Sequence, residues 1–569
     1  MKNKVIIFMI AMTFMASCKK YEETPLQGLK KNNIYDPLDK NGDYARQVLS
    51  DLYTSLPDGF NRVKADGDGS AGDFLDAGSD DALPSRLNKV VEYFSNGRLN
   101  STNNPDDNWA NAYRAIRSAN DFLANVDVVP VDANAPNTIK YWKAEARFIR
   151  AMNYFEMIKR YGGVPLIGDQ VLSPDSDLQI PRSTFAECVN YLISECDAIK
   201  GLLRTEPVAD SDLGRITRGC AYALKARVLL YAASPLYNGG GIAADPVKKA
   251  LAGYPAYDAS RWTTALNAVQ DLINLNVYSL TSTFNGVFIA RKNTEVILAK
   301  QRAKTFDIET NNAPVGYTTP LSNGFTSPTQ ELVDAFPMAN GLSITDPASG
   351  YSASNPYVGR DKRLDNTVFY NGMKWLNTRN VETFEGGRDK PGGVAVQTRT
   401  GYYLKKYMAD FSTATAYATQ DHNFIIFRYG EVLLDYAECL NEVGRTADAY
   451  APLIALRTRA GITAGTGANA YGIKTGLSQA DMRAFIQNER RIEMAFEEQR
   501  FWDIRRWKTA GQLLNGDLHG NRITRATSGA LTYVPYTVAT TTFSPKYYIM
   551  PIPYAEIVRN RKLVQNEGW

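Results

Sequence analysis

Apolar residues recur at steps of three and four along several long segments of the 569-residue chain. In residues 139–161, for example, Phe148, Met152 and Phe155 fall on one stripe. This spacing is the pattern of an amphipathic α-helix. The same reasoning predicts further helices over residues 44–56, 108–127, 181–203, 215–237, 260–276, 424–444, 446–460 and 478–508.

Several predicted helices follow one another closely and carry alanine and tyrosine at packing positions. In residues 215–237, Ala223 and Ala226 would let a neighbouring helix approach closely. Helical hairpins of this size are typical of tetratricopeptide-like folds, although no clean repeat period is present. We therefore predict a mainly α-helical protein with a scaffold of tetratricopeptide-like helical hairpins.

Two long stretches, residues 57–107 and 277–423, lack this periodicity and contain scattered Gly, Asp, Asn, Ser and Pro. Short apolar runs at residues 296–299 and 367–370 predict strands within the second stretch. Loops of this length are usually functional or disordered, and their aromatic content favours function. We expect one domain over residues 41–569 in which these two insertions form a loop-rich, ligand-binding portion.

The N-terminus has the pattern of a secretory leader. Lys2 and Lys4 precede an apolar run over residues 5–12, which is too short to span a bilayer. The small residues before Cys18 resemble a bacterial lipobox, which predicts a signal peptide over residues 1–17, an acylated Cys18 and a polar tether to residue 40. Acyl chains would hold the protein on a membrane without spanning it. The alternative is an ordinary leader with an incidental cysteine.

Composition narrows the function classes. The formal net charge of +4 becomes +2 without Lys2 and Lys4, which argues against a nucleic-acid partner. The chain has only two histidines, His422 and His519, and no Cys-x-x-Cys motif, so we expect no metal site and no cofactor. The other four cysteines are predicted to be buried thiols: Cys188, Cys196, Cys220 and Cys439.

Residues 489–507 are dense in charge and raise the question of a catalytic carboxylate pair. Neighbouring residues on a helix point about 100° apart, so Glu497 and Glu498 cannot flank one bond as the two carboxylates of a glycosidase do. The spacing instead predicts helical ion pairs, Glu497 with Arg500 and Asp503 with Arg506.

The acidic run over residues 66–81 invites a calcium interpretation, because hard cations take several oxygen ligands from a loop. The oxygen donors that it offers are Asp66, Asp68, Ser70, Asp73 and Asp76. The EF-hand template fails, with Ala71 where glycine is needed and Ala77 where a bidentate Glu should stand. A solvated turn is the favoured interpretation.

A series of motifs runs in order along the chain. It comprises Ala-Glu-Ala-Arg-Phe at residues 144–148, Tyr-Gly-Gly-Val-Pro-Leu at 161–166, residues 214–217 and 327–336, Arg-Asp-Lys-Arg-Leu at 360–364, the charged segment 489–507, and the closing segment 551–569. Together these motifs resemble the SusD/RagB family of Bacteroidetes outer-membrane lipoproteins. Three positions depart from the family pattern: Lys362 and Glu567 each replace a proline, and Trp569 replaces a tyrosine.

The resemblance implies an outer-membrane, lipid-anchored protein that faces the cell exterior. Members of the family are said to cover a SusC-like TonB-dependent transporter and to deliver glycans, or for some members peptides, to its channel. Sugar recognition needs flat apolar faces and planar polar groups. Residues 79–82 resemble a family element, and family binding surfaces draw on this region and the middle of the chain. The candidate ligand-binding residues are Asp80, Asp81, Arg86, Phe94, Asn96, Tyr317, Phe325, Tyr351 and Trp375.

The leading hypothesis is therefore a non-catalytic lipoprotein that captures an oligosaccharide and passes it to a partner transporter. A peptide ligand, as in the RagB branch, is the alternative that the sequence leaves open. A surface glycoside hydrolase or esterase is disfavoured, because no Gly-x-Ser-x-Gly elbow and no separated carboxylate pair is evident. A pure scaffold role, in which the helices buttress the transporter, is also left open, and it predicts that alanine at both Trp375 and Phe325 leaves ligand uptake unchanged.

Overall fold

The computed structural model describes residues 34–569 apart from 64–70, 131, 133–134, 174, 316, 318–321, 393–396, 410, 412, 414–417 and 466–468. The predicted leader, Cys18 and residues 18–33 of the tether lie outside the described residues, as do Asp66, Asp68 and Ser70. Within the described part of the chain, none of the helices combines the length and apolar character that crossing a membrane requires.

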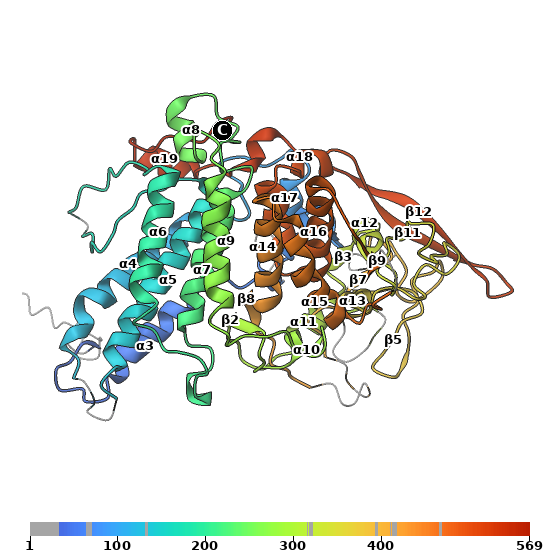
Figure 1. Ribbon diagram of the computed structural model, residues 1–569, viewed down its shortest axis with the longest axis horizontal. Coiled ribbons are helices and arrows are strands. Elements are labelled where there is room, and N and C mark those ends of the chain that lie inside the picture. The colour runs from blue at the N-terminus through green and yellow to red at the C-terminus, as the bar shows by residue number, and fades with distance from the viewer. Residues whose placement is uncertain are drawn as a thin grey trace, which may run out of the picture.

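Long helices lie side by side across one half of the molecule (Figure 1). They are α3 (Asp43–Leu52), α4 (Trp109–Asn125), α5 (Thr138–Tyr161), α6 (Phe185–Ile199), α7 (Arg218–Ala233) and α9 (Ser260–Ile273), with the short α8 (Pro246–Ala252) and α19 (Tyr554–Arg559) at one end. Consecutive helices pack against each other from α4 to α7, and α7 packs on α9. The predicted mainly helical fold is confirmed.

A second group of helices packs beside the first and occupies the centre of Figure 1. It contains α14 (Tyr429–Glu442), α15 (Tyr450–Ala460), α16 (Gln479–Glu493), α17 (Gln499–Arg506) and α18 (Ala510–Leu513). Helix α14 contacts both α9 and α16, so it joins the two groups.

Two predicted helix boundaries are wrong. The single helix expected over residues 478–508 is broken between α16 and α17, where Phe496 and Glu498 take positive φ angles of 60° and 58°. Residues at the start of the expected helix 424–444 form strand β8 (Phe424–Arg428), because a short apolar run suits a buried strand as well as a buried helix.

The loop-rich half holds short helices and small antiparallel sheets. Its helices are α10 (Gly286–Ile289), α11 (Asp307–Asn312), α12 (Gln330–Ala335) and α13 (Lys362–Thr367). The strands pair two by two, namely β1 (Ala82–Pro84) with β3 (Thr326–Pro328), β2 (Val296–Lys300) with β8, β4 (Val368–Phe369) with β7 (Tyr403–Leu404), β5 (Lys374–Trp375) with β6 (Arg379–Asn380), and β9 (Asn469–Ala470) with β10 (Ile473–Lys474). The predicted strands near residues 296 and 367 correspond to β2 and β4.

The longest strands form a hairpin that projects from the loop-rich half at the right of Figure 1. Strand β11 (Asp517–Arg525) pairs with β12 (Leu531–Thr540), with a register shift between Leu518 and His519. Apolar periodicity does not predict this hairpin, because most side chains on both strands are polar or exposed. A Ser-Gly pair within residues 526–530 is the turn signal that marks it.

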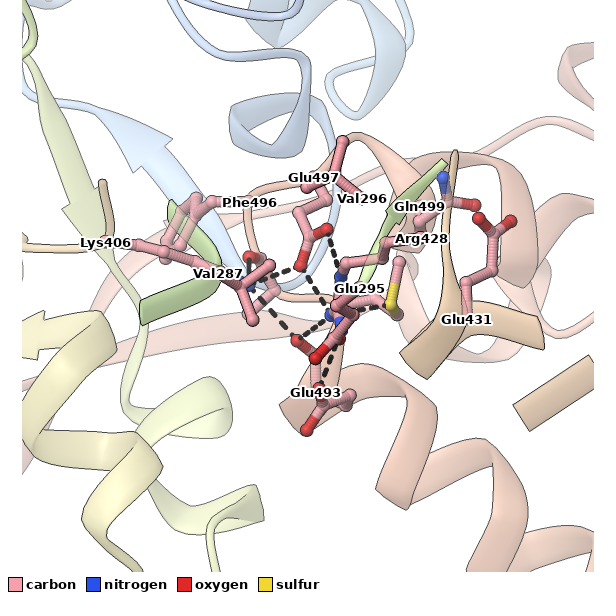
Figure 2. A network of polar contacts seen from close by, with 12 residues as sticks. Val287, Glu295, Val296, Lys406, Arg428, Glu431, Glu493, Phe496, Glu497 and Gln499 are labelled. Carbon is pink, nitrogen blue, oxygen red and sulfur yellow. Dashed lines mark hydrogen bonds and ion pairs between the residues drawn. The ribbon is translucent and has the colours of Figure 1, made fainter. Parts of the chain in front are cut away.

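The two helix groups together form the helical half of the protein. Buried ion pairs connect this helical half with the loop-rich half (Figure 2). The Arg428 guanidinium at the end of β8 lies 2.8 Å from Glu295 and Glu493 and 2.7 Å from Glu497, and all four side chains are inaccessible or nearly so. Lys406 also pairs with Glu497, at 2.6 Å. The dense charge of residues 489–507 is therefore used inside the protein.

One predicted helical ion pair is confirmed and the other is wrong. Asp503 pairs with Arg506 at 2.7 Å, as the three-residue spacing predicts. Glu497 pairs with Arg428 and Lys406 instead of Arg500, because it lies in the break between α16 and α17 and does not share a helical face with Arg500.

Candidate ligand-binding cleft

The predicted ligand residues Asp80 and Asp81 lie inside the protein, where they are 3% and 0% exposed. Asp80 accepts hydrogen bonds from Arg500 at 2.8 and 2.7 Å, and Asp81 accepts one from Arg491 at 2.6 Å. Burial alone would raise the pKa of the Asp80 carboxyl, but Arg491 and Arg500 outweigh it and hold this pKa below its usual range. The pair therefore fastens residues 79–82 to α16 and α17.

Four predicted aromatic residues are also buried. Phe94 packs edge-on against Phe501 with ring centroids 4.8 Å apart, and Tyr317 packs against Trp375 at 5.2 Å. Phe325 lies under the Arg86 guanidinium, 3.7 Å from its ring centroid. Phe94, Tyr317 and Trp375 are part of the hydrophobic core that also contains the buried faces of the long helices, because a segment without long helices must still bury apolar surface.

Only three of the nine predicted residues reach the surface, and they do not converge. Asn96 is exposed, and Arg86 and Tyr351 are half-buried. The Tyr351 ring lies beside Arg360, while residue 96 pairs with residue 542 near the base of the hairpin. The structure thus corrects the expectation that the six buried side chains face a ligand and that the aromatic rings gather on one surface.

The acidic run before residue 81 is also not the solvated turn that was expected, as far as it is described. Asp73 is buried and accepts a hydrogen bond from Arg86 at 3.2 Å. Asp76 is fully buried, and burial, with Glu498 and Asp81 nearby, raises the pKa of its carboxyl well above 3.8. Within the described part of the chain, no cluster of three His, Cys, Asp or Glu side chains is placed to hold a metal ion.

Two concavities among the described residues are considered as ligand sites. An apolar groove of about 610 Å³ lies between α4 and α19, with Trp109, Tyr113, Ile116, Leu172, Leu178 and Leu563 among its lining residues. A polar cleft of about 500 Å³ lies between the β11–β12 hairpin and residues 383–392 with Arg399 of the loop-rich half. Both volumes fall in the range of small-ligand sites. We call the second the hairpin cleft; its polar lining includes Thr383, Glu385, Lys390, Arg399, Arg522 and Tyr536.

Backbone contacts hold the two walls of the hairpin cleft together. The Asn521 amide donates to the Thr400 carbonyl at 2.8 Å, and the Glu385 amide donates to the Ile523 carbonyl at 2.8 Å. Gly520 permits this approach, since a Cβ atom there would lie 2.6 Å from the Thr400 backbone. The Tyr536 hydroxyl donates to the Arg399 carbonyl across the same junction.

The cleft presents planar cations beside an aromatic ring. The Arg522 guanidinium lies 5.2 Å from the Tyr536 ring centroid, and its Nε is 3.6 Å from Glu385 Oε1. Arg399 pairs through Nη1 with Glu92 at 2.7 Å. Burial raises the pKa of the Tyr536 hydroxyl above its usual value. Such groups bind hydroxyl-rich or anionic molecules through hydrogen bonds and ring contacts.

The residues of this cleft were not among the predicted ligand residues. Arg399 belongs to the predicted loop-rich insertion, but nothing in its local sequence separates it from other arginines. Arg522 lies between the buried Asn521 and Ile523 on β11, and Tyr536 lies on the partner strand, so recognising the Ser-Gly turn would have been the route to both residues.

Comparisons with known proteins agree with this architecture. A SusD family model matches residues 294–569, and a model described as starch-binding, associating with the outer membrane, matches residues 45–230. SusD-like protein P2 of Formosa agariphila is 24% identical over 589 positions, which cover 100% of this chain and 99% of the relative.

Solved structures of SusD-like proteins have a similar fold. A SusD-like protein of Bacteroides fragilis has a TM-score of 0.77 and 25% identity, covering 95% of this chain and 100% of its own. A laminarin-binding SusD-like protein has a TM-score of 0.63 and 21% identity, covering 93% and 100%. The two family models together span most of the chain, and this chain belongs to the SusD/RagB family.

Proposed function

We propose that this protein binds an oligosaccharide in the hairpin cleft and passes it to a SusC-like TonB-dependent transporter in the outer membrane. The observation that carries the proposal is the cleft itself, an open concavity of about 500 Å³ lined by planar polar side chains and the Tyr536 ring. Membership in a family of SusD-like carbohydrate-binding proteins, one model of which is described as starch-binding, supports a saccharide as the ligand.

Binding is proposed to occur without cleavage. Among the described residues that line the hairpin cleft, Glu385 is the only carboxylate. Glycosidases of the common type need two carboxyl groups on opposite sides of the scissile bond. The cleft therefore supports capture of a saccharide by hydrogen bonds and ring contacts alone.

Titration calorimetry of the detergent-solubilised protein tests the ligand class, with an oligosaccharide panel and a peptide library as two arms. Saccharide binding is expected, and Tyr536→Ala should weaken it about tenfold, equivalent to ~1.4 kcal/mol. Tyr257→Ala is the matched control, since Tyr257 is 66% exposed and does not line the cleft. Binding to peptides only would favour the RagB-like alternative.

The proposed location is the outer face of the outer membrane, with Cys18 acylated. Growth in labelled palmitate should mark the wild-type chain and leave Cys18→Ala unmarked. Equal labelling of both would contradict this anchor. Copurification with a TonB-dependent transporter from solubilised outer membranes tests the partner, and its loss in a Tyr536→Ala strain is not expected, since the ring serves the ligand.

A further inference from the structure

We infer that the hairpin cleft selects an acidic saccharide, one that carries carboxylate or sulfate groups. The inference rests on the proposed function, because it names the class of saccharide for the same cleft. Three cations, Lys390, Arg399 and Arg522, line the cleft, against the single carboxylate of Glu385. The lining is thus positive, whereas the whole chain has a formal net charge of only +4.

These cations keep much of their hydrogen-bonding capacity. The 3.6 Å between Arg522 Nε and Glu385 Oε1 exceeds the length of a good N–H···O hydrogen bond, which is about 2.7–3.2 Å. Both side chains of this pair are more than half exposed, so the pair is weak. The Arg522 guanidinium can therefore leave Glu385 and bind a ligand with little loss of free energy.

Arg399 is held in place and still has donors left. Its Nη1 atom bonds to Glu92 at 2.7 Å and to the Pro84 carbonyl at 3.2 Å. Within the described part of the chain, Nε and Nη2 of this guanidinium make no hydrogen bond. Lys390 makes no ion pair with any described residue. An arginine fixed at one nitrogen presents its remaining edge in a defined direction, which suits a planar carboxylate or a sulfate oxygen pair.

With a neutral sugar, Lys390 would have no counter-charge among the described residues and Arg522 would have only its weak pair with Glu385, whereas an acidic sugar would supply further counter-charges and would bind the free donors of Arg399. Charge-assisted hydrogen bonds are about twice as strong as neutral ones, so the difference acts directly on affinity. The cleft is open to water, and exposed charges are screened within about 10 Å at 0.1 M salt. Selectivity for acidic saccharides should therefore decrease as the salt concentration rises.

The test compares oligosaccharides of equal length in three sets: neutral glucans, oligogalacturonates and sulfated galactans. Calorimetry of the full detergent-solubilised protein at 50 mM and 300 mM NaCl should show at least tenfold tighter binding of one acidic set than of the neutral set at low salt, with a smaller ratio at high salt. A neutral set that binds as tightly as the acidic sets would overturn the inference and leave the proposed function standing. Failure of every saccharide would overturn both.

Variants assign the effect to the cleft. Arg522→Gln and Lys390→Gln should each weaken acidic-saccharide binding several-fold, while Glu385→Gln should strengthen it. Lys143→Gln is the matched control, since Lys143 pairs with Asp127 on the surface of the helical half. Polyglutamate serves as a polyanion probe. If it competes as well as the acidic sugars, the cleft binds any polyanion, and recognition of a saccharide is overturned. Unchanged binding in Arg522→Gln and Lys390→Gln would overturn the inference as well.

Discussion

Charged residues that look catalytic in the sequence serve here as internal connections. Arg428, Glu493 and Glu497 are fully enclosed and satisfy one another at 2.7–2.8 Å. A buried ion pair of this kind adds little over a well-packed apolar substitute, but removing one partner leaves an uncompensated charge in a medium of low polarity. Each member of the network is therefore needed to keep the charges of the others paired.

Replacement of the central arginine tests this account at a single residue. Arg428→Met is expected to lower the free energy of unfolding by about 3–5 kcal/mol, because three carboxylates lose a shared partner. Lys143→Met, at a surface pair with Asp127, should cost less than ~1 kcal/mol. Urea titration measures both. A loss for Arg428→Met no larger than that of the control would contradict the account.

The acid limb of stability should depend on Asp106 and Glu156, which contact Arg160 at 2.9 and 2.6 Å. Burial alone would raise both pKa values, but Arg160 with Arg62 for Asp106, and Lys159 with Arg160 for Glu156, lower each of them to about 2. Both pKa values are lower in the folded state than the ~4 of an unfolded chain. The stabilisation is therefore complete above about pH 5 and lost as the pH falls toward 2.

Urea midpoints between pH 6 and pH 2.5 provide the measurement. The midpoint should fall steadily below pH 5 in the wild type. Asp106→Asn removes one of the two groups, so its midpoint should start lower at pH 6 and fall less steeply. Parallel curves for the two proteins would show that Asp106 does not carry this dependence.

Among the elements, the hairpin β11–β12 differs most from what apolar periodicity predicts, and it forms one wall of the proposed cleft. Its strands bury few side chains, and backbone contacts to residues 385 and 400 hold it in place. The break between α16 and α17 likewise depends on contacts with distant segments, since it places Glu497 against Arg428 and Lys406. Such tertiary contacts override local helix preference.

A methyl group at the hairpin junction should disturb the cleft without disturbing the helices. Gly520→Ala places a Cβ atom 2.6 Å from the Thr400 backbone, so one wall must move, and the expected loss of stability is about 1–3 kcal/mol. Saccharide binding should weaken with it. Gly516→Ala, where a Cβ atom would meet nothing within 4 Å, is the control. Calorimetry and far-UV circular dichroism check both, and unchanged binding in Gly520→Ala would contradict the cleft geometry.

On the scale of the whole molecule, the loop-rich half is bound to the helical half by both backbone and charge. Strand β2 pairs with β8, which runs directly into α14. Arg363 of α13 contacts Glu489 and Glu493 of α16 at 2.7 and 3.0 Å, in full enclosure. Because these side chains are buried, separating the two halves would leave their charges without partners.

The two halves are therefore expected to unfold together. Urea unfolding followed by far-UV circular dichroism, which reports the long helices, should coincide with loss of hydrogen-exchange protection in β4 and β7 of the loop-rich half. Loss of protection in β4 and β7 at a lower urea concentration would show that the halves are separate cooperative units.

The sequence alone determined what depends on local spacing and local motifs. Apolar stripes located the long helices, and the absence of periodicity marked residues 57–107 and 277–423 as segments without long helices. The ordered motifs indicated the family, and the four buried cysteines followed from apolar helical surroundings. The apolar periodicity of a helix is a property of a short stretch of sequence, so it can be recognised without knowledge of the fold.

Only the tertiary structure decided which aromatic and charged side chains face inward and which line an open surface. Asp80 meets Arg500, a residue 420 positions away, and that meeting turns a candidate ligand contact into an internal ion pair. The burial of Phe94, Tyr317 and Trp375 also depends on tertiary contacts. An aromatic ring in a loop can serve a core or a ligand equally well, and only its neighbours in the fold decide between the two. The hairpin cleft likewise exists because Thr400 and Gly520 come together from segments that are distant in the chain.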